Sequence, residues 1–382
     1  MRTSFLPFHR PQITESDIDA VSNTMRSGWL TTGPQSDRFE EEFAEYVGAS
    51  HAVSVNSGTA ALHLALEAIG VSAGDEIIIP TMTFAATAEV VEYTGAIPIL
   101  VDCAPDMLTI DPVSAANALT PRTKAIIPMH YGGHPCDMDT LSKLSDAHAI
   151  HIVEDAAHAL PTSFRGQTIG SLSEFTCFSF YATKTITSGE GGMITTENGD
   201  HARRMRKMRL HGIEQAPKDG SAWQYQISGK GFKYNLSDLS AALGLSQLRR
   251  CDSMWRRRSV IAETYDKSFR DIPAISVPAR ATHTDPSWHL YTLRLKHNLL
   301  TINRDQFIQQ LANAQIGTSV HYKPLHQHPK YAQNSRYSSA QFPQADQAFQ
   351  DILSLPIYSA MTDQDVADVV DAVIDTVNRH TR

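Results

Sequence analysis

The stretch FTCFSFYATKTITSGEGGMITT, at residues 175–196, holds two β-rich runs that are joined by a glycine-containing turn. The runs at 175–180 and 191–196 both predict β-strands. One lysine, Lys184, lies in the segment between them. We therefore expect Lys184 to lie just beyond the end of a strand.

Similar runs recur along the chain before this stretch. Five of them precede it, separated by helical stretches: AVSVN (52–56), EIIIP (76–80), IPILVD (97–102), AIIPMH (125–130) and IHIVED (150–155). Several are apolar at consecutive positions, which is typical of strands that are buried on both faces of a parallel sheet. Strands that alternate with helices over two hundred residues predict an α/β fold, with a mostly parallel sheet flanked by helices.

The segments outside this region predict further elements. A first helix begins at the capping pattern of Thr14 and Asp17, has Ile18, Val21 and Met25 at helical spacing, and ends at Gly28. A long helix is expected over 237–269, with Ser237 as its N-cap. The rest of the chain predicts strands at 288–295 and 318–322 and helices at 304–314 and 362–377. We interpret this as a large domain over residues 1–255 and a smaller C-terminal α+β domain over 256–382.

Composition excludes several classes of protein. Of 382 residues, 42% are apolar and 19% charged, and the net charge is −8, which disfavours binding to nucleic acid or to an anionic membrane. We expect no membrane helix, because no segment approaches about 18 uninterrupted apolar residues. The N-terminus does not resemble a secretory signal, and the four cysteines form no CxxC pair. We expect reduced thiols, a cytoplasmic protein and no metal site.

The segment NSGTAAL, at 56–62, has the features of a phosphate-binding turn. A strand ends there and a helix begins, so unpaired N–H groups lie at the positive end of the helix dipole. Gly58 has no side chain to keep an anion away, and the hydroxyls of Ser57 and Thr59 are available as donors. The alternative is an ordinary N-capped helix.

Asp155 is the acidic residue at the end of the apolar run IHIV. An ionised carboxylate at a partly buried strand end needs a cationic or N–H partner, and a pyridinium nitrogen is one such partner. A metal ligand and a helix N-cap are the alternatives.

Lys184 follows an apolar strand and precedes a glycine-rich turn. Desolvation would lower the pKa of its amine, as a nucleophile requires, although a salt-bridged structural lysine has the same position. Together, a phosphate-binding turn, a strand-end carboxylate and a loop lysine in one α/β sheet predict covalently bound pyridoxal 5′-phosphate (PLP).

Several motifs in the chain resemble those of a known family. These are SGWLTTGP (27–34), VNSGTAALHLAL (55–66), PRTKAIIPMHYGGHPCDMD (121–139), VEDAAHA (153–159), FSFYATKTITSGEGGMI (178–194) and GFKYNLSDLSAALGLSQL (231–248). In this order they resemble the DegT-type sugar aminotransferases, from about residue 5 to the C-terminal helix. The resemblance implies the aspartate aminotransferase-like fold (PLP fold type I).

The resemblance also assigns roles at the cofactor. Lys184 would carry PLP, Asp155 would pair with the ring nitrogen, and His158 would lie near the phenolic oxygen. Phe84 would stack on the ring face. The residues that would hold the phosphate are Gly58, Thr59 and Ser179.

A second group of residues would serve the substrate or a partner subunit. Asn235 would reach the phosphate in the neighbouring subunit, which implies a homodimer with shared active sites. Many relatives have this asparagine two positions earlier, where this chain has Lys233. Thr31 and His321 would face the sugar.

Within the family the chain is most similar to the 4-aminotransferases of UDP-4-keto sugars, such as the enzyme that forms UDP-4-amino-4-deoxy-L-arabinose. The resemblance implies transfer of the amino group of L-glutamate to the C4 ketone of a UDP-linked keto-sugar, for a surface glycan such as lipopolysaccharide. The alternatives are a 3-aminotransferase, an aminotransferase for a sugar linked to another nucleotide, or a non-catalytic regulator with this fold.

A sugar dehydratase is disfavoured because those relatives replace the lysine with histidine. A Rossmann-type dehydrogenase is disfavoured because no GxGxxG follows a strand.

Two further groups of residues allow other interpretations. His321, His326 and His328 fit no standard zinc spacing. The basic residues between Arg203 and Arg209 predict a solvated helix face, with the binding of a nucleotide diphosphate as the alternative.

Overall fold

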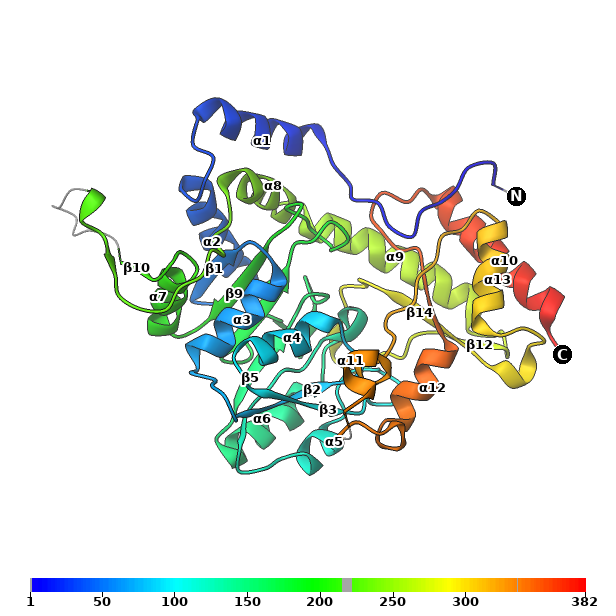
Figure 1. The fold of residues 1–382 in the computed structure, drawn as a ribbon. Helices are drawn as coiled ribbons and strands as arrows, with labels where there is room; N and C mark the ends of the chain where they lie inside the picture. The colour runs from blue at the N-terminus through cyan, green and yellow to red at the C-terminus, as the bar shows by residue number, and fades with distance from the viewer. Residues whose placement is uncertain (1, 215–221, 335) are drawn as a thin grey trace.

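The computed structural model describes residues 2–214, 222–334 and 336–382. Its centre is a seven-stranded sheet (Figure 1). The strands lie in the order β1 (His51–Val55), β9 (Gly192–Thr196), β8 (Phe175–Ser179), β5 (His151–Asp155), β4 (Thr123–Ile126), β2 (Glu76–Pro80) and β3 (Ile97–Val101). Neighbours from β8 to β3 are parallel, and β9 is antiparallel to both β1 and β8. The predicted mostly parallel α/β sheet is confirmed.

Helices cover both faces of this sheet. The apolar clusters on one face include α3 (Gly58–Ala68), α4 (Ala85–Tyr93) and α7 (Gly199–Met208). The opposite face packs against α2 (Pro34–Val47), α5 (Pro112–Asn117), α6 (Met138–His148) and α8 (Asp238–Leu248). In β2, Ile77 and Ile79 belong to the first cluster and Ile78 to the opposite one, all fully buried. Consecutive apolar residues therefore mark strands buried on both faces, as expected.

Helix α1 (Glu15–Ser27) has the predicted capping box at Thr14 and Asp17. Its polar side is attached to the neighbouring helices, because the buried Asp17 carboxylate accepts hydrogen bonds from three side chains: Ser246, Gln247 and Arg250. Its apolar residues Ile18 and Met25 are 48% and 61% exposed. The helix is thus held by polar contacts and leaves its apolar face uncovered in the single chain.

The chain beyond α8 forms a second core, which we call the C-terminal unit. Its antiparallel sheet has the order β12 (Ile275–Ser276), β14 (Tyr291–Leu295) and β15 (Ile352–Leu355), and its long helices are α9 (Cys251–Phe269), α10 (Arg304–Asn313) and α13 (Asp363–His380). The predicted domain boundary at residue 255 falls inside α9, and it stays a prediction. The N-terminal arm, residues 2–13, crosses to this unit (Figure 1), where Leu6 forms a parallel bridge with Ile316.

Two predicted elements differ from the structure. The single helix expected over 237–269 is broken between α8 and α9, because Arg250 has φ −112° and ψ 4°, outside the helical range. Ser237 nevertheless caps α8 as predicted, since its hydroxyl accepts from the Ser240 amide. The strand expected at 318–322 is wrong, because only Ser319 pairs, in one bridge with Ser354 on β15, before the chain turns away.

The remaining elements are short. They are β6 (Ser163–Phe164), β7 (Gln167–Thr168), β10 (Ile213–Glu214), β11 (Gln226–Ile227), β13 (Thr284–Asp285), α11 (Pro329–Ala332), α12 (Pro343–Asp351) and the 3₁₀ turns η1 (Tyr131–Gly133), η2 (Ala222–Gln224), η3 (His297–Leu299), η4 (Leu325–Gln327) and η5 (Ser339–Gln341). Across the three described ranges, every helix is too short or too polar to span a bilayer.

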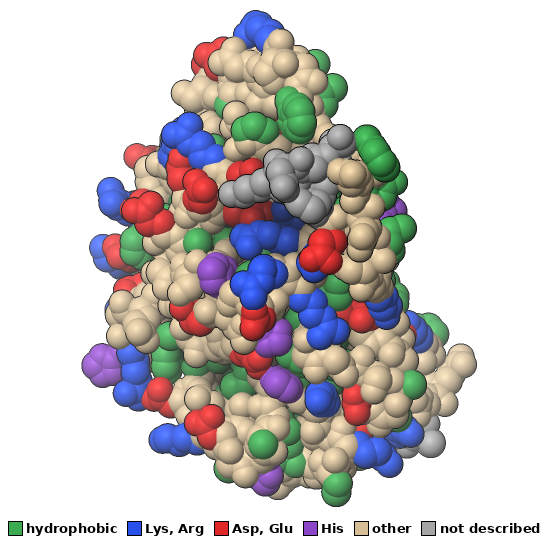
Figure 2. Space-filling model, turned by 90° about the vertical axis from the view of Figure 1, so that its left-hand side faces the viewer, with side chains coloured by type: hydrophobic (Ala, Val, Ile, Leu, Met, Phe, Trp, Pro, Cys, Tyr) green, Lys and Arg blue, Asp and Glu red, His purple; other side chains and the backbone are tan. Residues whose placement is uncertain are grey.

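The basic residues of α7 lie on the side of the molecule that carries β10. On this face, basic side chains are interspersed with acidic ones (Figure 2). Lys207 pairs with Glu214 at 2.7 Å, and Arg203 pairs with Asp200. Arg209 is buried instead and pairs with Glu40, so the prediction of a solvated face is wrong for this residue. Arg203, Lys207 and Arg209 thus have carboxylate partners, which disfavours a nucleotide diphosphate site at these three residues.

Candidate active site

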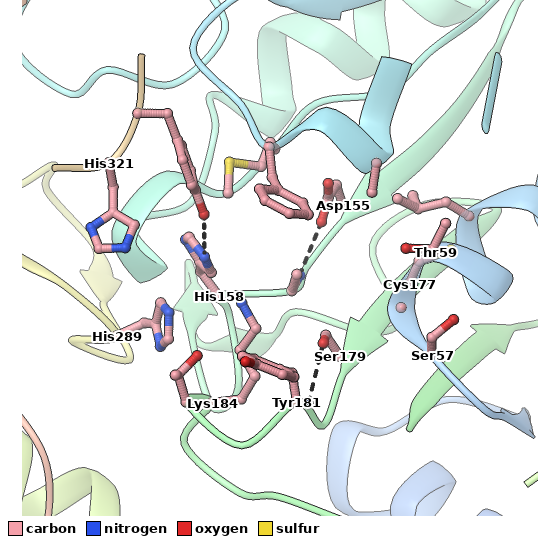
Figure 3. A pocket seen from close by; sticks show the side chains of 18 of the residues that line it. Ser57, Thr59, Asp155, His158, Cys177, Ser179, Tyr181, Lys184, His289 and His321 are labelled. Atoms are coloured by element: carbon pink, nitrogen blue, oxygen red, sulfur yellow. Dashed lines mark hydrogen bonds between the residues drawn. The ribbon is translucent and has the colours of Figure 1, made fainter. Parts of the chain in front are cut away.

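A cavity of about 640 Å³ opens at the carboxyl ends of the sheet strands. Asp155 is the last residue of β5, Ser179 is the last of β8, and Gly58 begins the helix that follows β1. The opposite wall comes from the C-terminal unit and the N-terminal arm, and Figure 3 shows side chains of both walls. The carboxyl edge of a parallel sheet is the usual place for a ligand in this class of fold.

The phosphate-binding turn predicted from NSGTAAL forms one end of the cavity. Ser57 is the N-cap of α3, and its hydroxyl accepts from the Ala60 amide at 3.0 Å, which leaves the proton of the hydroxyl available to a ligand. A Cβ on Gly58 would lie 2.9 Å from the Ser179 Cβ, so only glycine allows this close approach. Gly58, Thr59 and Ser179 thus meet at an open helix N-terminus, which favours an anion.

Asp155 lies in the wall of the cavity and is almost completely buried. Its carboxylate accepts from the Thr87 hydroxyl at 2.9 Å and from the Ala157 amide at 3.2 Å. Burial raises the pKa of Asp155, and these two hydrogen bonds and the charge of Lys184 oppose the rise. No helix begins after Asp155, so the N-cap alternative is not supported.

Lys184 lies in the segment between β8 and β9 and lines the same cavity. Burial lowers the pKa of its amine to about 8, while the charge of Asp155 acts in the opposite direction. Figure 3 shows Lys184 and Asp155 on opposite sides of the open space. In the described part of the chain Lys184 has no carboxylate within ion-pair distance, which argues against a salt-bridged structural lysine.

His158 connects the sheet to the wall opposite the phosphate-binding turn. Its Nδ1 accepts from the Gly132 amide at 3.2 Å, and its Nε2 lies 3.0 Å from the Tyr322 hydroxyl. Burial lowers the pKa of His158 well below its usual value, and the charge of Lys184 lowers it further. His158 is therefore a neutral imidazole at pH 7.

The predicted substrate and stacking residues of this wall also line the cavity. His321 Nδ1 lies 2.9 Å from the Ser354 hydroxyl, and burial lowers the pKa of His321 to about 4. Phe84 is 59% exposed, and its ring centroid lies 6.1 Å from that of Tyr322. Phe84 thus has the free ring face that stacking requires.

Thr31 and Asn235 lie outside the cavity. Asn235 donates from its amide to the Thr32 hydroxyl at 2.7 Å, and the Thr31 carbonyl accepts from the Asp238 amide. The two predicted residues are therefore close together, in the loop before α2 and the segment before α8. Their roles stay predictions.

Several residues of the cavity were not predicted. Among them, the N-terminal arm and the C-terminal unit contribute Phe8, His9, His289 and Tyr322. His9 Nε2 lies 3.1 Å from the Ala182 carbonyl, two residues before Lys184, and the Phe8 ring lies 5.4 Å from that of His321. Tyr322 directly follows His321, which was predicted to face the sugar. This adjacency is the one feature of the sequence that could have indicated Tyr322.

The other sequence hypotheses concern metals and cysteines. Within the described residues no group of three or more His, Cys, Asp or Glu side chains could hold a metal ion. His326 contacts Thr81 and Asp346, and His328 contacts the Lys323 carbonyl, so the histidines of this segment do not converge. All four cysteines are free and buried.

The comparisons with known proteins agree with this geometry. A model of the DegT/DnrJ/EryC1/StrS aminotransferase family matches residues 11–374. The chain belongs to this family. It is an aminotransferase with the predicted fold, and the resemblance drawn from the motifs is confirmed.

One curated relative and two solved structures illustrate the similarity. The spore coat polysaccharide biosynthesis protein SpsC of Bacillus subtilis is 44% identical over 381 residues, which cover 98% of each chain. A Streptococcus pneumoniae protein assigned as a sugar aminotransferase, in its PMP form, has a TM-score of 0.92 and 34% identity over 98% of each chain. DesV of S. venezuelae has a TM-score of 0.89 and 37% identity over 96% of this chain and 95% of its own. The S. pneumoniae protein was also solved in a PLP form.

The residues of the cavity fit PLP. The open N-terminus of α3, kept clear by Gly58, matches a phosphate, and the buried Asp155 carboxylate, which has no cationic partner within the described chain, matches a pyridinium nitrogen. Lys184, with its lowered pKa, matches an amine that condenses with an aldehyde. The predicted cofactor agrees with the forms in which the S. pneumoniae protein was solved.

Proposed function

We propose that this aminotransferase moves the amino group of L-glutamate to the C4 ketone of a UDP-linked 4-keto sugar, for the synthesis of a surface glycan. PLP is the cofactor of the reaction. The observation that carries the proposal is the meeting of Asp155, Lys184 and the α3 N-terminus in one cavity. A sugar substrate is supported by the names of the relatives, since SpsC is a polysaccharide biosynthesis protein.

The residues of the chain account for the reactive part of this proposal. Bound PLP supplies a ring that withdraws electrons from the carbon that carries the amino group. Asp155 would hold the ring nitrogen in its protonated form, because its buried carboxylate needs a cationic partner. Lys184 would hold the cofactor covalently until the amino donor displaces it, and the freed amine, whose pKa burial lowers to about 8, would then take and return a proton at the substrate carbon. Because one cavity serves both substrates, we expect ping-pong kinetics.

The substrate side of the cavity suits a sugar. His321 and Tyr322 place polar groups on this wall, and Phe84 has an exposed ring at its edge. A neutral His321 both donates and accepts hydrogen bonds, as sugar hydroxyls do. The nucleotide base, the C4 position and the glutamate donor rest on the motifs alone.

A panel of nucleotide keto-sugars tests the substrate. The PLP-loaded protein is incubated with L-glutamate and with 4-keto sugars linked to UDP, dTDP or GDP, and the products are examined by NMR. We expect oxoglutarate and a sugar with a new amine at C4, formed fastest with UDP. An amine at C3, or a preference for another nucleotide, identifies the alternative aminotransferases. Bound PLP without amino transfer from any donor would support a non-catalytic regulator.

The proposal includes a homodimer with shared sites. Besides Thr31 and Asn235, which lie outside their own cavity, exposed apolar residues gather near α1: Ile18, Met25, Trp29 and Leu30. An apolar surface of this kind is typical of a protein interface. Four buried thiols are in keeping with a reducing compartment, and we place the reaction in the cytoplasm.

Subunit mixing tests the shared site. Lys184→Ala and Asn235→Ala should each be inactive alone, because each removes one part of every site. In mixed dimers one site carries both changes and the other carries neither, so refolding an equal mixture should restore about one quarter of wild-type activity. No restoration, or an active monomer in mass photometry, would contradict the shared site.

A further inference from the structure

Three residues form a hydrogen-bond chain on the wall opposite the phosphate-binding turn. The Gly132 amide lies 3.2 Å from His158 Nδ1, and His158 Nε2 lies 3.0 Å from the Tyr322 hydroxyl. His158 is 3% exposed, so water does not replace these partners. The dashed line between His158 and the neighbouring hydroxyl in Figure 3 marks the second of these contacts.

The direction of each hydrogen bond follows from the first one. A backbone amide can only donate, so His158 Nδ1 carries no proton and accepts. A neutral imidazole then has its proton on Nε2, which donates to the Tyr322 oxygen. The Tyr322 hydroxyl can therefore still donate its own proton, and no acceptor for it is found among the described residues. Since Tyr322 lines the cavity, this proton is available to a ligand.

The chemistry of the cofactor indicates which ligand atom takes this proton. Around the PLP ring, the nitrogen lies opposite the carbon that bears the aldehyde, and the phosphate arm and the phenolic oxygen lie on opposite flanks. In Figure 3, Asp155 and Lys184 lie on opposite sides of the cavity, Ser57, Thr59 and Ser179 lie on one flank, and His158 lies on the other. A ring held by the first five residues therefore turns its phenolic oxygen toward His158 and Tyr322.

We propose that Tyr322 donates a hydrogen bond to the phenolic oxygen of PLP and that His158 acts as the positioning residue that orients this hydroxyl. The inference rests on the cofactor of the proposed function and not on its sugar substrate. The charged and titratable groups around the pair are Lys184, His289, His321, Asp155 and Tyr131. His289 packs against His158 with ring centroids 4.1 Å apart.

A pH titration of the visible absorbance of bound PLP tests this inference. A donor to the phenolic oxygen stabilises its anion, so removal of the donor should raise the pH at which the absorbance changes. For Tyr322→Phe we expect an upward shift of about one pH unit, the size of one hydrogen bond to a charged group. Glutamate and sugar are absent, so the measurement does not depend on activity.

Tyr131→Phe is the matched control. The Tyr131 hydroxyl donates to the His321 carbonyl, so this change loosens the same segment and leaves the Tyr322 hydroxyl in place. We expect the Tyr131 variant to titrate like the wild type. An unshifted Tyr322→Phe protein that still binds PLP would overturn the inference, and so would an equal shift in both variants. A wild-type protein that binds no PLP would instead contradict the proposed function.

Discussion

The sheet side of the cavity and the side formed by the C-terminal unit contribute different kinds of groups. On the sheet side, Asp155 and Ser179 end strands, and Gly58 begins a helix directly after one. On the other side, His9, His289 and Tyr322 come from three separate segments outside regular strands and helices. The sheet side holds charged or anion-binding groups, whereas burial keeps His9, His289 and His321 neutral by lowering the pKa of each.

This difference indicates that the two sides of the cavity have different functions. Strand ends in one sheet hold their side chains at fixed separations, which suits a cofactor that has three fixed attachment points. Neutral imidazole and phenol groups on separate segments suit an uncharged sugar that must enter and leave. We therefore expect changes on the sheet side to affect cofactor binding and chemistry, and changes at His9, His289 and His321 on the other side to affect substrate binding, whereas Tyr322 also contacts the cofactor in our inference.

The largest effect is expected for Lys184→Ala. The change removes both the covalent link to PLP and the group that moves the proton, so amino transfer should fall by at least about 10³-fold. Single-turnover assays with glutamate measure this loss. Retention of more than a tenth of the wild-type rate would contradict the role of Lys184.

Asp155→Asn should weaken PLP binding by about 10- to 100-fold, because a neutral amide cannot replace a hydrogen bond between a carboxylate and a protonated ring nitrogen. Absorbance titration with PLP measures the affinity. Thr87→Val is the matched variant, since it removes one hydrogen bond to the same carboxylate and should cost less than tenfold. Equal losses in the two variants would contradict the pairing of Asp155 with the ring.

The two sides also differ in how far the sequence predicted them. Asp155 and Lys184 were predicted because Asp155 ends an apolar run and Lys184 lies just beyond one, so local pattern and place relative to the sheet coincide. His321 and Tyr322 show the opposite case. A strand at 318–322 would turn these two adjacent side chains to opposite faces, whereas both line the cavity, because pairing with β15 stops at Ser319.

Contacts over long sequence distances explain the other omissions. His9 reaches the Ala182 carbonyl only because the N-terminal arm is bound to the C-terminal unit at Leu6, more than three hundred residues away from its partner Ile316. Nothing in the residues around position 9 indicates that contact. For α1, the capping box was predicted from Thr14 and Asp17, but the attachment of Asp17 to α8 was not.

Gly317→Ala should change only the wall of the cavity that the N-terminal arm helps to form. A Cβ at this position would lie 2.8 Å from the Phe8 amide nitrogen and 2.9 Å from the Leu6 carbonyl, so the arm must move. We expect a destabilisation of about 1–3 kcal/mol and a rise of about tenfold in the KM for the sugar, with the PLP spectrum unchanged.

Gly229→Ala is the control for that variant, because no atom lies within 4 Å of its added Cβ. Its Tm should equal that of the wild type. A Gly317→Ala protein that loses PLP, or that keeps the wild-type KM, would contradict the assignment of the arm to the substrate side.

The smallest effect concerns the stability of the protein without PLP. Burial lowers the pKa of Lys184 from 10.5 to about 8, so the unfolded chain binds more protons between these two values, and stability rises with pH across that window. Below pH 8 the folded protein contains Lys184 as a buried ammonium, so the whole destabilising effect of burying this charge is present. Lys184→Met should therefore have a higher Tm than the wild type at pH 7, by a few degrees, and the difference should shrink toward pH 10.5. Parallel thermal melts from pH 7 to pH 10 measure it, and a constant difference would argue against the lowered pKa.

Borohydride reduction of the PLP-loaded protein, followed by digestion and peptide mass spectrometry, tests most directly whether the cavity binds PLP through Lys184. Reduction makes the link between lysine and cofactor permanent, so the mass of the reduced pyridoxyl group marks the lysine that carries it. We predict one labelled peptide, containing Lys184, and no label in the Lys184→Ala protein. Stoichiometric label on another lysine, with Lys184 unmodified, would contradict the account.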